Sequence, residues 1–245
     1  MPSAILTRSH QENRRLAPVF RRRGFRVFSA PMIELLPIPP DASITQQWLA
    51  AGGSRVVLSS AAAAQQWLAA LPNLPIPPDS VRYWIVGQRS RDLVQTRFPN
   101  SPIEALANSG AELLRQIPPG LAAPAILYPC SSQRRDELVD GLRDRGARVM
   151  ELPLYRPQLP ANAARRLRTA IRGAGVPLCF VFFSPSAVAN FISLQPELPH
   201  GAIFAAVGST TAQALRRNGV AEVITPSKPN GALLADAILE AIEQP

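Results

Sequence analysis

The chain repeats itself: four blocks from its first half recur, in the same order, in its second half. The paired blocks are ILTR at 5–8 and ILYP at 126–129, VVLSSA at 56–61 and VFFSPS at 181–186, WIVG at 84–87 and AAVG at 205–208, and NSGAELL at 108–114 and PNGALL at 229–234. Gly208 and Gly231 each lie 121 positions after their counterparts, Gly87 and Gly110. Four matched blocks in one order indicate an internal duplication, so both copies should build the same structure.

Each block has the pattern of a strand that leads into a helix. VVL at 56–58 and CFVFF at 179–183 are continuously apolar, as strands buried on both faces should be. Capping boxes of the form S-x-x-E begin at Ser9 and Ser109, and helix ends are predicted just before Gly24, Gly146 and Gly219. The pattern predicts an α/β protein with doubly wound parallel sheets, flavodoxin- or Rossmann-like, and favours two sheets of about five strands over one barrel.

Two proline-rich segments, at 30–40 and 151–160, interrupt this pattern at equivalent places in the two copies. Proline at such density forbids a helix and disfavours a central strand, but it suits an extended connector. We therefore predict a two-segment extended connector between two domains. Because the chain crosses twice, one of these domains must be discontinuous.

The chain carries 26 Lys and Arg against 17 Asp and Glu, a formal net charge of +9. A nucleic-acid-binding protein usually gathers its cations on one element or tail. Here the densest run, at 21–23, has the pattern of a solvated helix end, and the arginines at 134–148 alternate with acidic residues. We expect no nucleic-acid partner. An arginine-rich RNA-binding protein is kept as an alternative that a salt titration of RNA affinity would test.

Three further features bear on the compartment of the protein. No stretch approaches the roughly 18–20 apolar residues that a membrane-spanning helix needs. The N-terminus shows no basic region followed by an apolar run, so no signal peptide is expected. Cys130 and Cys179 form neither a disulfide framework nor a metal motif. We expect a cytoplasmic protein that involves no membrane and no metal.

Together these motifs resemble the uroporphyrinogen-III synthase family, and the resemblance spans nearly the whole chain. It rests on LTR at 6–8, VLSSA at 57–61, NSGAELL at 108–114, LYR at 154–156, FFSPSAV at 182–188 and AVGSTTAQAL at 206–215. The resemblance implies a discontinuous domain of residues 1–33 with 160–245, an inserted domain of residues 39–151, and connectors at 34–38 and 152–159.

The resemblance also implies an activity. The family is a lyase that closes linear hydroxymethylbilane to uroporphyrinogen III, with loss of water and inversion of ring D, in the cleft between its two domains. This reaction serves haem, sirohaem, corrin or chlorophyll biosynthesis and implies neither a metal nor an organic cofactor. A monomer whose lobes open and close is expected. The alternative is a two-lobed small-ligand-binding protein without catalysis, against which the lack of a signal peptide argues.

In open α/β sheets, ligands bind beyond the carboxyl ends of the strands. The residues at those ends are small or hydroxylic and precede helix N-termini, which suit the carboxylates of an octacarboxylate substrate. Each hydroxyl could instead be a helix cap alone. The predicted substrate-binding residues are Thr7, Arg8, Ser59, Ser60, Gly87, Ser90, Ser109, Gly110, Arg135, Ser184, Ser186, Gly208, Ser209, Thr210 and Thr211.

Tyr155 is the predicted catalytic residue. It lies in the second proline-rich segment and matches the connector tyrosine of the family. A phenol is protonated at neutral pH, so it can donate a hydrogen bond to the departing hydroxyl of the substrate. Packing within the connector is the alternative role. His10 and His200 have no carboxylate partner on a strand-end loop in the sequence pattern, and no catalytic triad is visible.

Overall fold

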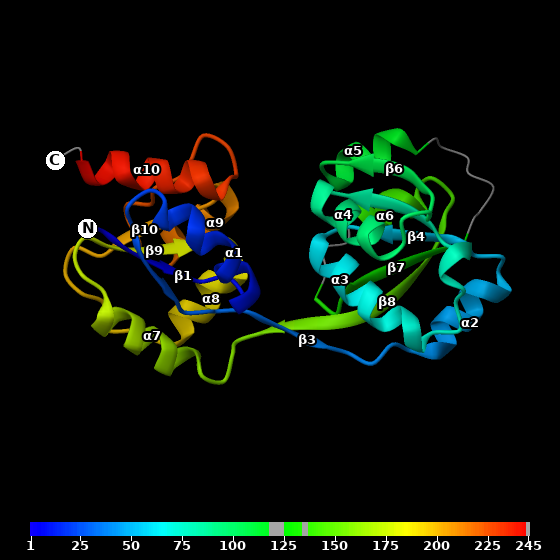
Figure 1. Ribbon diagram of the computed structural model, residues 1–245, viewed down its shortest axis with the longest axis horizontal. Helices are drawn as coiled ribbons and strands as arrows, with labels where there is room; N and C mark the ends of the chain where they lie inside the picture. The colour runs from blue at the N-terminus through cyan, green and yellow to red at the C-terminus, as the bar shows by residue number, and fades with distance from the viewer. Residues whose placement is uncertain (118–124, 134–136, 244–245) are drawn as a thin grey trace. The chain divides into compact units, whose positions relative to one another are not determined.

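The computed structural model describes residues 1–117, 125–133 and 137–243. The chain divides into two compact units (Figure 1). Unit 1 consists of Met1–Leu35 with Gln158–Pro245, and unit 2 consists of Leu36–Pro157. Both changes of unit fall inside the proline-rich segments, and unit 1 is the discontinuous one.

Unit 1 is a parallel sheet with the strand order β10-β9-β1-β2. Its strands are β1 (Ser3–Leu6), β2 (Arg26–Ser29), β9 (Leu178–Phe182) and β10 (Ile203–Ala206). Successive side chains of a strand point to opposite faces, so both faces are buried. Ala4 and Leu6 pack with one layer of helices and Ile5 with the other. The first layer is α1 (His10–Arg21) and α10 (Gly231–Glu243), and the second is α7 (Ala163–Gly173), α8 (Pro185–Ser193) and α9 (Ser209–Arg217).

Unit 2 has the strand order β3-β8-β7-β4-β5-β6 and is parallel from β8 through β6. Its strands are β3 (Glu34–Pro37), β4 (Arg55–Leu58), β5 (Arg82–Val86), β6 (Ile103–Ala107), β7 (Ala125–Ser131) and β8 (Arg148–Gln158). Its helices are α2 (Ala42–Ala50), α3 (Ala61–Ala70), α4 (Gln88–Arg97), α5 (Gly110–Gln116) and α6 (Glu137–Arg143), with short 3-10 turns at Leu71–Asn73 and Pro78–Ser80.

Equivalent strands have the same spatial order in the two sheets: β10-β9-β1-β2 in unit 1 corresponds to β5-β4-β7-β8 in unit 2. Numbered along the chain, the strands of unit 1 have the flavodoxin-like order 2-1-3-4, and the strands β4 to β8 of unit 2 have the Rossmann-like order 3-2-1-4-5. In each unit, two strands come from the first half of one copy and two from the second half of the other copy. The predicted class, α/β with doubly wound parallel sheets from a duplication, is confirmed. Within the described residues, the sheets have four and six strands rather than about five each.

The helix termini agree in part with the sequence pattern. Gly24, Gly146 and Gly219 adopt positive φ angles of 83°, 86° and 87°, as predicted for residues that end helices. The prediction of a capping box at Ser9 is wrong, because the Ser9 side chain makes no capping hydrogen bond to α1. At Ser109, the hydroxyl accepts from the Glu112 amide as expected, but the Glu112 carboxylate accepts from the Asn108 amide instead of from Ser109.

The second proline-rich segment is a strand, which corrects the expectation that its prolines exclude a central position. β8 lies between β3 and β7 and contains Pro153. Its pairing with β7 shifts after the Cys130–Pro153 pair, so that Ser131 lies opposite Tyr155. A proline cannot donate a ladder hydrogen bond, and a β-bulge of this kind accommodates the loss. No helix among the described residues is long and apolar enough to cross a membrane.

We predict that Gly24→Ala lowers the free energy of unfolding by about 1 kcal/mol, because alanine disfavours a positive φ. No atom lies within 4 Å of the added Cβ, so the cost is purely conformational. Urea unfolding would measure it. Gly175→Ala is the control, since Gly175 has no positive φ and keeps its amide bond to Ser3. Equal destabilisation by both changes would contradict this account.

Candidate functional site

A pocket of about 620 Å³ opens where the strands of unit 2 end. The central strands β4 and β7 pair only at Arg55–Ile126 and Val56–Leu127, whereas β7 continues alongside β8 as far as Ser131. The two central strands therefore part toward their carboxyl ends, at the switch point where ligands bind in this fold. The pocket is lined by Ser59, Val86, Ser109, Gly110, Ala111, Leu114, Tyr128, Cys130, Ser131, Gln133, Glu137, Leu138 and Tyr155.

Tyr155, the predicted catalytic residue, lies in the wall of this pocket. The β-bulge opposite Ser131 sets its direction, and the Tyr155 carbonyl accepts a hydrogen bond of 2.9 Å from the Ser132 amide. The residue is 8% exposed. Burial raises the pKa of Tyr155 above its ordinary value of 10.0, and a hydrogen bond with the Ser60 side chain opposes this rise. The phenol is therefore a neutral donor throughout the physiological pH range.

Three of the predicted binding residues share the pocket with Tyr155: Ser59, Ser109 and Gly110. Ser109 also caps α5, so this residue both caps a helix and lines the pocket. Ser60 caps α3 through a bond of 3.1 Å from the Ala63 amide, and its side chain also reaches Tyr155. Ser60 therefore ties the start of α3 to the phenol.

Three other predicted hydroxyls are buried. Thr7 is 0% exposed, and its hydroxyl donates to the Val181 carbonyl at 2.7 Å. Ser90 is 1% exposed and donates to the Val86 carbonyl at 2.7 Å. Thr211 is buried in α9. The Thr7 hydroxyl joins the ends of β1 and β9, and the Ser90 hydroxyl ties the first turn of α4 to the end of β5, so their present contacts are structural.

Other predicted residues lie at strand ends of unit 1 or at backbone turns. Ser184 caps α8 through a bond of 3.2 Å from the Ala187 amide. Gly87 has a φ of 87° and its amide donates to Ala107. Arg135 lies outside the described residues. The remaining predicted residues precede or begin helices: Arg8 before α1, Ser186 in α8, Gly208 before α9, and Ser209 and Thr210 in α9.

The sequence pattern missed Tyr128, which is 3% exposed and lines the same pocket as Tyr155. Tyr128 is the counterpart of Thr7, 121 positions later. In unit 1, Thr7 holds β1 to β9 by two bonds to Val181, one from its amide and one from its hydroxyl. A comparison of the two copies at this position would have found the difference, since a phenol replaces the hydroxyl that joins the central strands.

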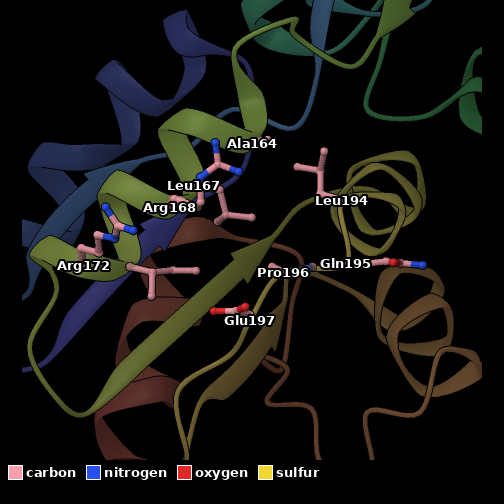
Figure 2. A pocket seen from close by; sticks show the side chains of 9 residues that line it. Ala164, Leu167, Arg168, Arg172, Leu194, Gln195, Pro196 and Glu197 are labelled. Atoms are coloured by element: carbon pink, nitrogen blue, oxygen red, sulfur yellow. The ribbon is translucent and has the colours of Figure 1, made fainter.

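A second pocket, of about 390 Å³, lies in unit 1 between α7 and the segment that follows α8 (Figure 2). Figure 2 shows Arg168 and Arg172 on α7 and Glu197 on that segment. The segment leads into the amino end of β10, so this pocket lies away from the carboxyl ends of the strands. Among the described residues, no group of three or more His, Cys, Asp or Glu side chains could hold a metal ion.

The fold and the pocket define a duplicated, doubly wound α/β protein with a pocket at the strand ends. The model of the family "Uroporphyrinogen-III synthase HemD" matches residues 14–236, which include parts of both units. The chain therefore belongs to the uroporphyrinogen-III synthase family.

Curated relatives and solved structures agree with this membership. The chain is 26% identical to uroporphyrinogen-III synthase of Chlorobaculum parvum, over 66% of this chain and 67% of that protein. It is 23% identical to the chloroplastic uroporphyrinogen-III synthase of Oryza sativa subsp. japonica, over 98% of this chain and 81% of that protein. The structure of uroporphyrinogen-III synthetase from Helicobacter pylori shares the fold with a TM-score of 0.70 at 15% identity, covering 98% of this chain and 100% of that one. The structure of a mutant synthase from Thermus thermophilus shares the fold with a TM-score of 0.61 at 18% identity. The match covers 99% of this chain and 100% of that one.

We predict that Thr7→Val lowers the free energy of unfolding by about 1 kcal/mol, because the buried hydroxyl loses its bond to the Val181 carbonyl. Urea unfolding would measure the change. Ser186→Ala is the control: it removes a hydroxyl from an exposed position, and it should change the free energy of unfolding by less than about half the change expected for Thr7→Val. An unchanged stability of Thr7→Val would show that this hydroxyl does not hold β1 to β9.

Proposed function

We propose that this chain cyclises hydroxymethylbilane to uroporphyrinogen III, with loss of water and inversion of ring D. The observation that carries the proposal is the family match over residues 14–236. The pocket of unit 2 supports it, because its volume suits a small-molecule ligand and its wall holds the predicted tyrosine.

The reaction begins with the departure of the terminal hydroxyl of hydroxymethylbilane as water. Tyr155 donates a hydrogen bond to this oxygen and favours its departure, leaving an electron-poor azafulvene. Attack by ring D at its substituted carbon gives a spiro intermediate, whose rearrangement inverts the ring. Loss of a proton in the last step restores the aromatic pyrrole, so the net products are uroporphyrinogen III and water. Because pyrroles are electron-rich, holding the linear tetrapyrrole substrate in a shape ready to cyclise supplies most of the rate acceleration.

The surroundings of Tyr155 suit a donor more than a base. Burial, the largest influence, disfavours the phenolate and so keeps the proton on the oxygen. Tyr128 and Cys130 reinforce this effect, since charge on either group also raises the pKa of Tyr155. Cys130 and Tyr128 line the same pocket and contribute little solvent-exposed surface.

We further propose that the chain acts as a monomer in the cytoplasm and uses no nucleic-acid partner. The spread of its cations over many elements supports the last point. The relative from rice carries the description "chloroplastic", so the compartment differs among members of the family.

The activity is tested by supplying hydroxymethylbilane and separating the oxidised products by chromatography. We expect the type III isomer, formed faster than the spontaneous type I product. Heat-denatured protein is the control and should give type I alone. Type I alone at the spontaneous rate from the folded protein would refute the proposal and favour the non-catalytic alternative.

We predict that Tyr155→Phe lowers kcat about tenfold to a hundredfold, the scale of one general acid. The raised pKa of Tyr155 means that its donor form is lost only as pH rises through a value above 10.0. Wild-type activity should therefore show no loss from this group across the neutral pH range.

Tyr83→Phe is the matched control for this prediction. The Tyr83 phenol is also buried, but it accepts a hydrogen bond of 3.2 Å from the Trp67 indole and does not line the pocket. We expect this variant to retain its kcat while its stability falls. An unchanged kcat in Tyr155→Phe would remove Tyr155 from the mechanism.

A further inference from the structure

Arg8 and Phe183 meet at the carboxyl ends of the two central strands of unit 1. Arg8 lies two residues after β1, and Phe183 follows β9 directly. The central carbon of the Arg8 guanidinium is 5.1 Å from the centre of the Phe183 ring. β1 and β9 are the strands between which the sheet order reverses, so the pair stands at the ligand-binding edge of the fold.

The backbone beneath Arg8 is held on two sides. The buried Asn13 side chain, 1% exposed, donates to the carbonyls of Leu6 at 2.8 Å and Arg8 at 2.9 Å. Thr7 is tied to Val181 by its amide and its hydroxyl. With the main chain fixed, the direction of the guanidinium depends on the contacts of the Arg8 side chain.

Phe183 and Glu12 supply two of those contacts. A Glu12 oxygen lies 3.1 Å from one terminal nitrogen of Arg8. The Arg8 guanidinium carbon lies over the Phe183 ring. The ring attracts the guanidinium and so restricts the directions of its N–H groups, which can donate to a carboxylate. Arg8 remains 41% exposed, which leaves surface for a ligand.

We propose that Phe183 is a positioning residue that orients Arg8 toward a carboxylate of the substrate. This inference rests on the proposed function and deepens it. Phe183 does not itself bind the carboxylate; its ring restricts the rotamers of Arg8, so less freedom is lost when the substrate binds.

The chain offers a matched control. The guanidinium carbon of Arg26 lies 5.2 Å from the Phe28 ring centre, a pair with nearly the same geometry. Arg26 begins β2, at the amino end of the sheet, where ligands do not bind in this fold. Phe28→Leu therefore removes the same kind of cation–π contact, but at the amino end of the sheet, away from the proposed substrate site.

The first measurement compares KM and kcat for hydroxymethylbilane. We expect Phe183→Leu to raise KM about two- to fivefold, the scale of one exposed cation–π contact, with kcat within about twofold of the wild type. Phe183→Trp should restore KM, because an indole also attracts a guanidinium. Phe28→Leu should leave KM unchanged. Thermal melting of each variant separates misfolding from a change in affinity.

A second measurement tests whether Phe183 acts through Arg8. In the Arg8→Ala background, Phe183→Leu should raise KM no further. The Nε–H signal of Arg8 in NMR spectra should move in Phe183→Leu, since the ring current is lost, and stay in place in Phe28→Leu. Additive effects on KM, or an unmoved signal, would overturn the positioning role.

Binding of uroporphyrin III, the oxidised product with the same carboxylates, separates this inference from the proposed function. Its affinity, followed by fluorescence, should fall about two- to fivefold in Phe183→Leu. Wild-type protein that forms only type I product refutes the function, yet this affinity still decides the role of Phe183. A wild type that forms type III, with KM and affinity unchanged in Phe183→Leu, overturns the positioning inference alone.

Discussion

The pairing of central strands from different copies is the constraint on which the rest of the structure depends. β1 pairs with β9, and β7 pairs with β4, so neither copy completes a sheet from its own strands. The bond from the Thr7 hydroxyl to Val181 joins residues 174 positions apart. Such distant pairing carries a large loop-closure cost, which only the completed and buried sheet can offset. The same pairing brings Arg8 to Phe183 in unit 1 and the end of β7 to Ser59 in unit 2.

The two copies then differ at the point where their central strands end. In unit 1, Thr7 fastens β1 to β9. In unit 2, Tyr128 occupies the equivalent position, the paired part of β4 and β7 ends at Val56 and Leu127, and a pocket follows. A duplicated fold thus places two switch points in one chain. Where unit 1 has Thr7, the central strands are hydrogen-bonded to their ends, and where unit 2 has Tyr128, they part and a pocket forms.

More of the fold than of the candidate site could be predicted from the sequence. Apolar runs and the repeat predicted parallel α/β sheets, because burial on both faces leaves a direct compositional mark. Which strands pair across copies left no such mark, and neither did the bulge in β8, where proline suggested only a connector. Hydroxyls do follow the strands, but their directions could not be predicted. The Thr7 hydroxyl turns into the sheet whereas Ser59 lines a pocket, and only tertiary packing decides between these outcomes.

The placement of charge explains how one chain can attract an octacarboxylate and still keep a phenol protonated. A net charge of +9 spread over many elements gives a field that draws anions to the protein. A cation beside Tyr155 would favour the phenolate and lower the pKa of Tyr155, so the phenol would lose its proton at a lower pH. Among the described residues that line the Tyr155 pocket there is no Lys or Arg, and burial holds the phenol neutral. Arg8 lies at the strand ends of unit 1, and Tyr155 lies in the pocket of unit 2. In the proposed mechanism, attraction of the substrate and acid assistance therefore rest on different residues.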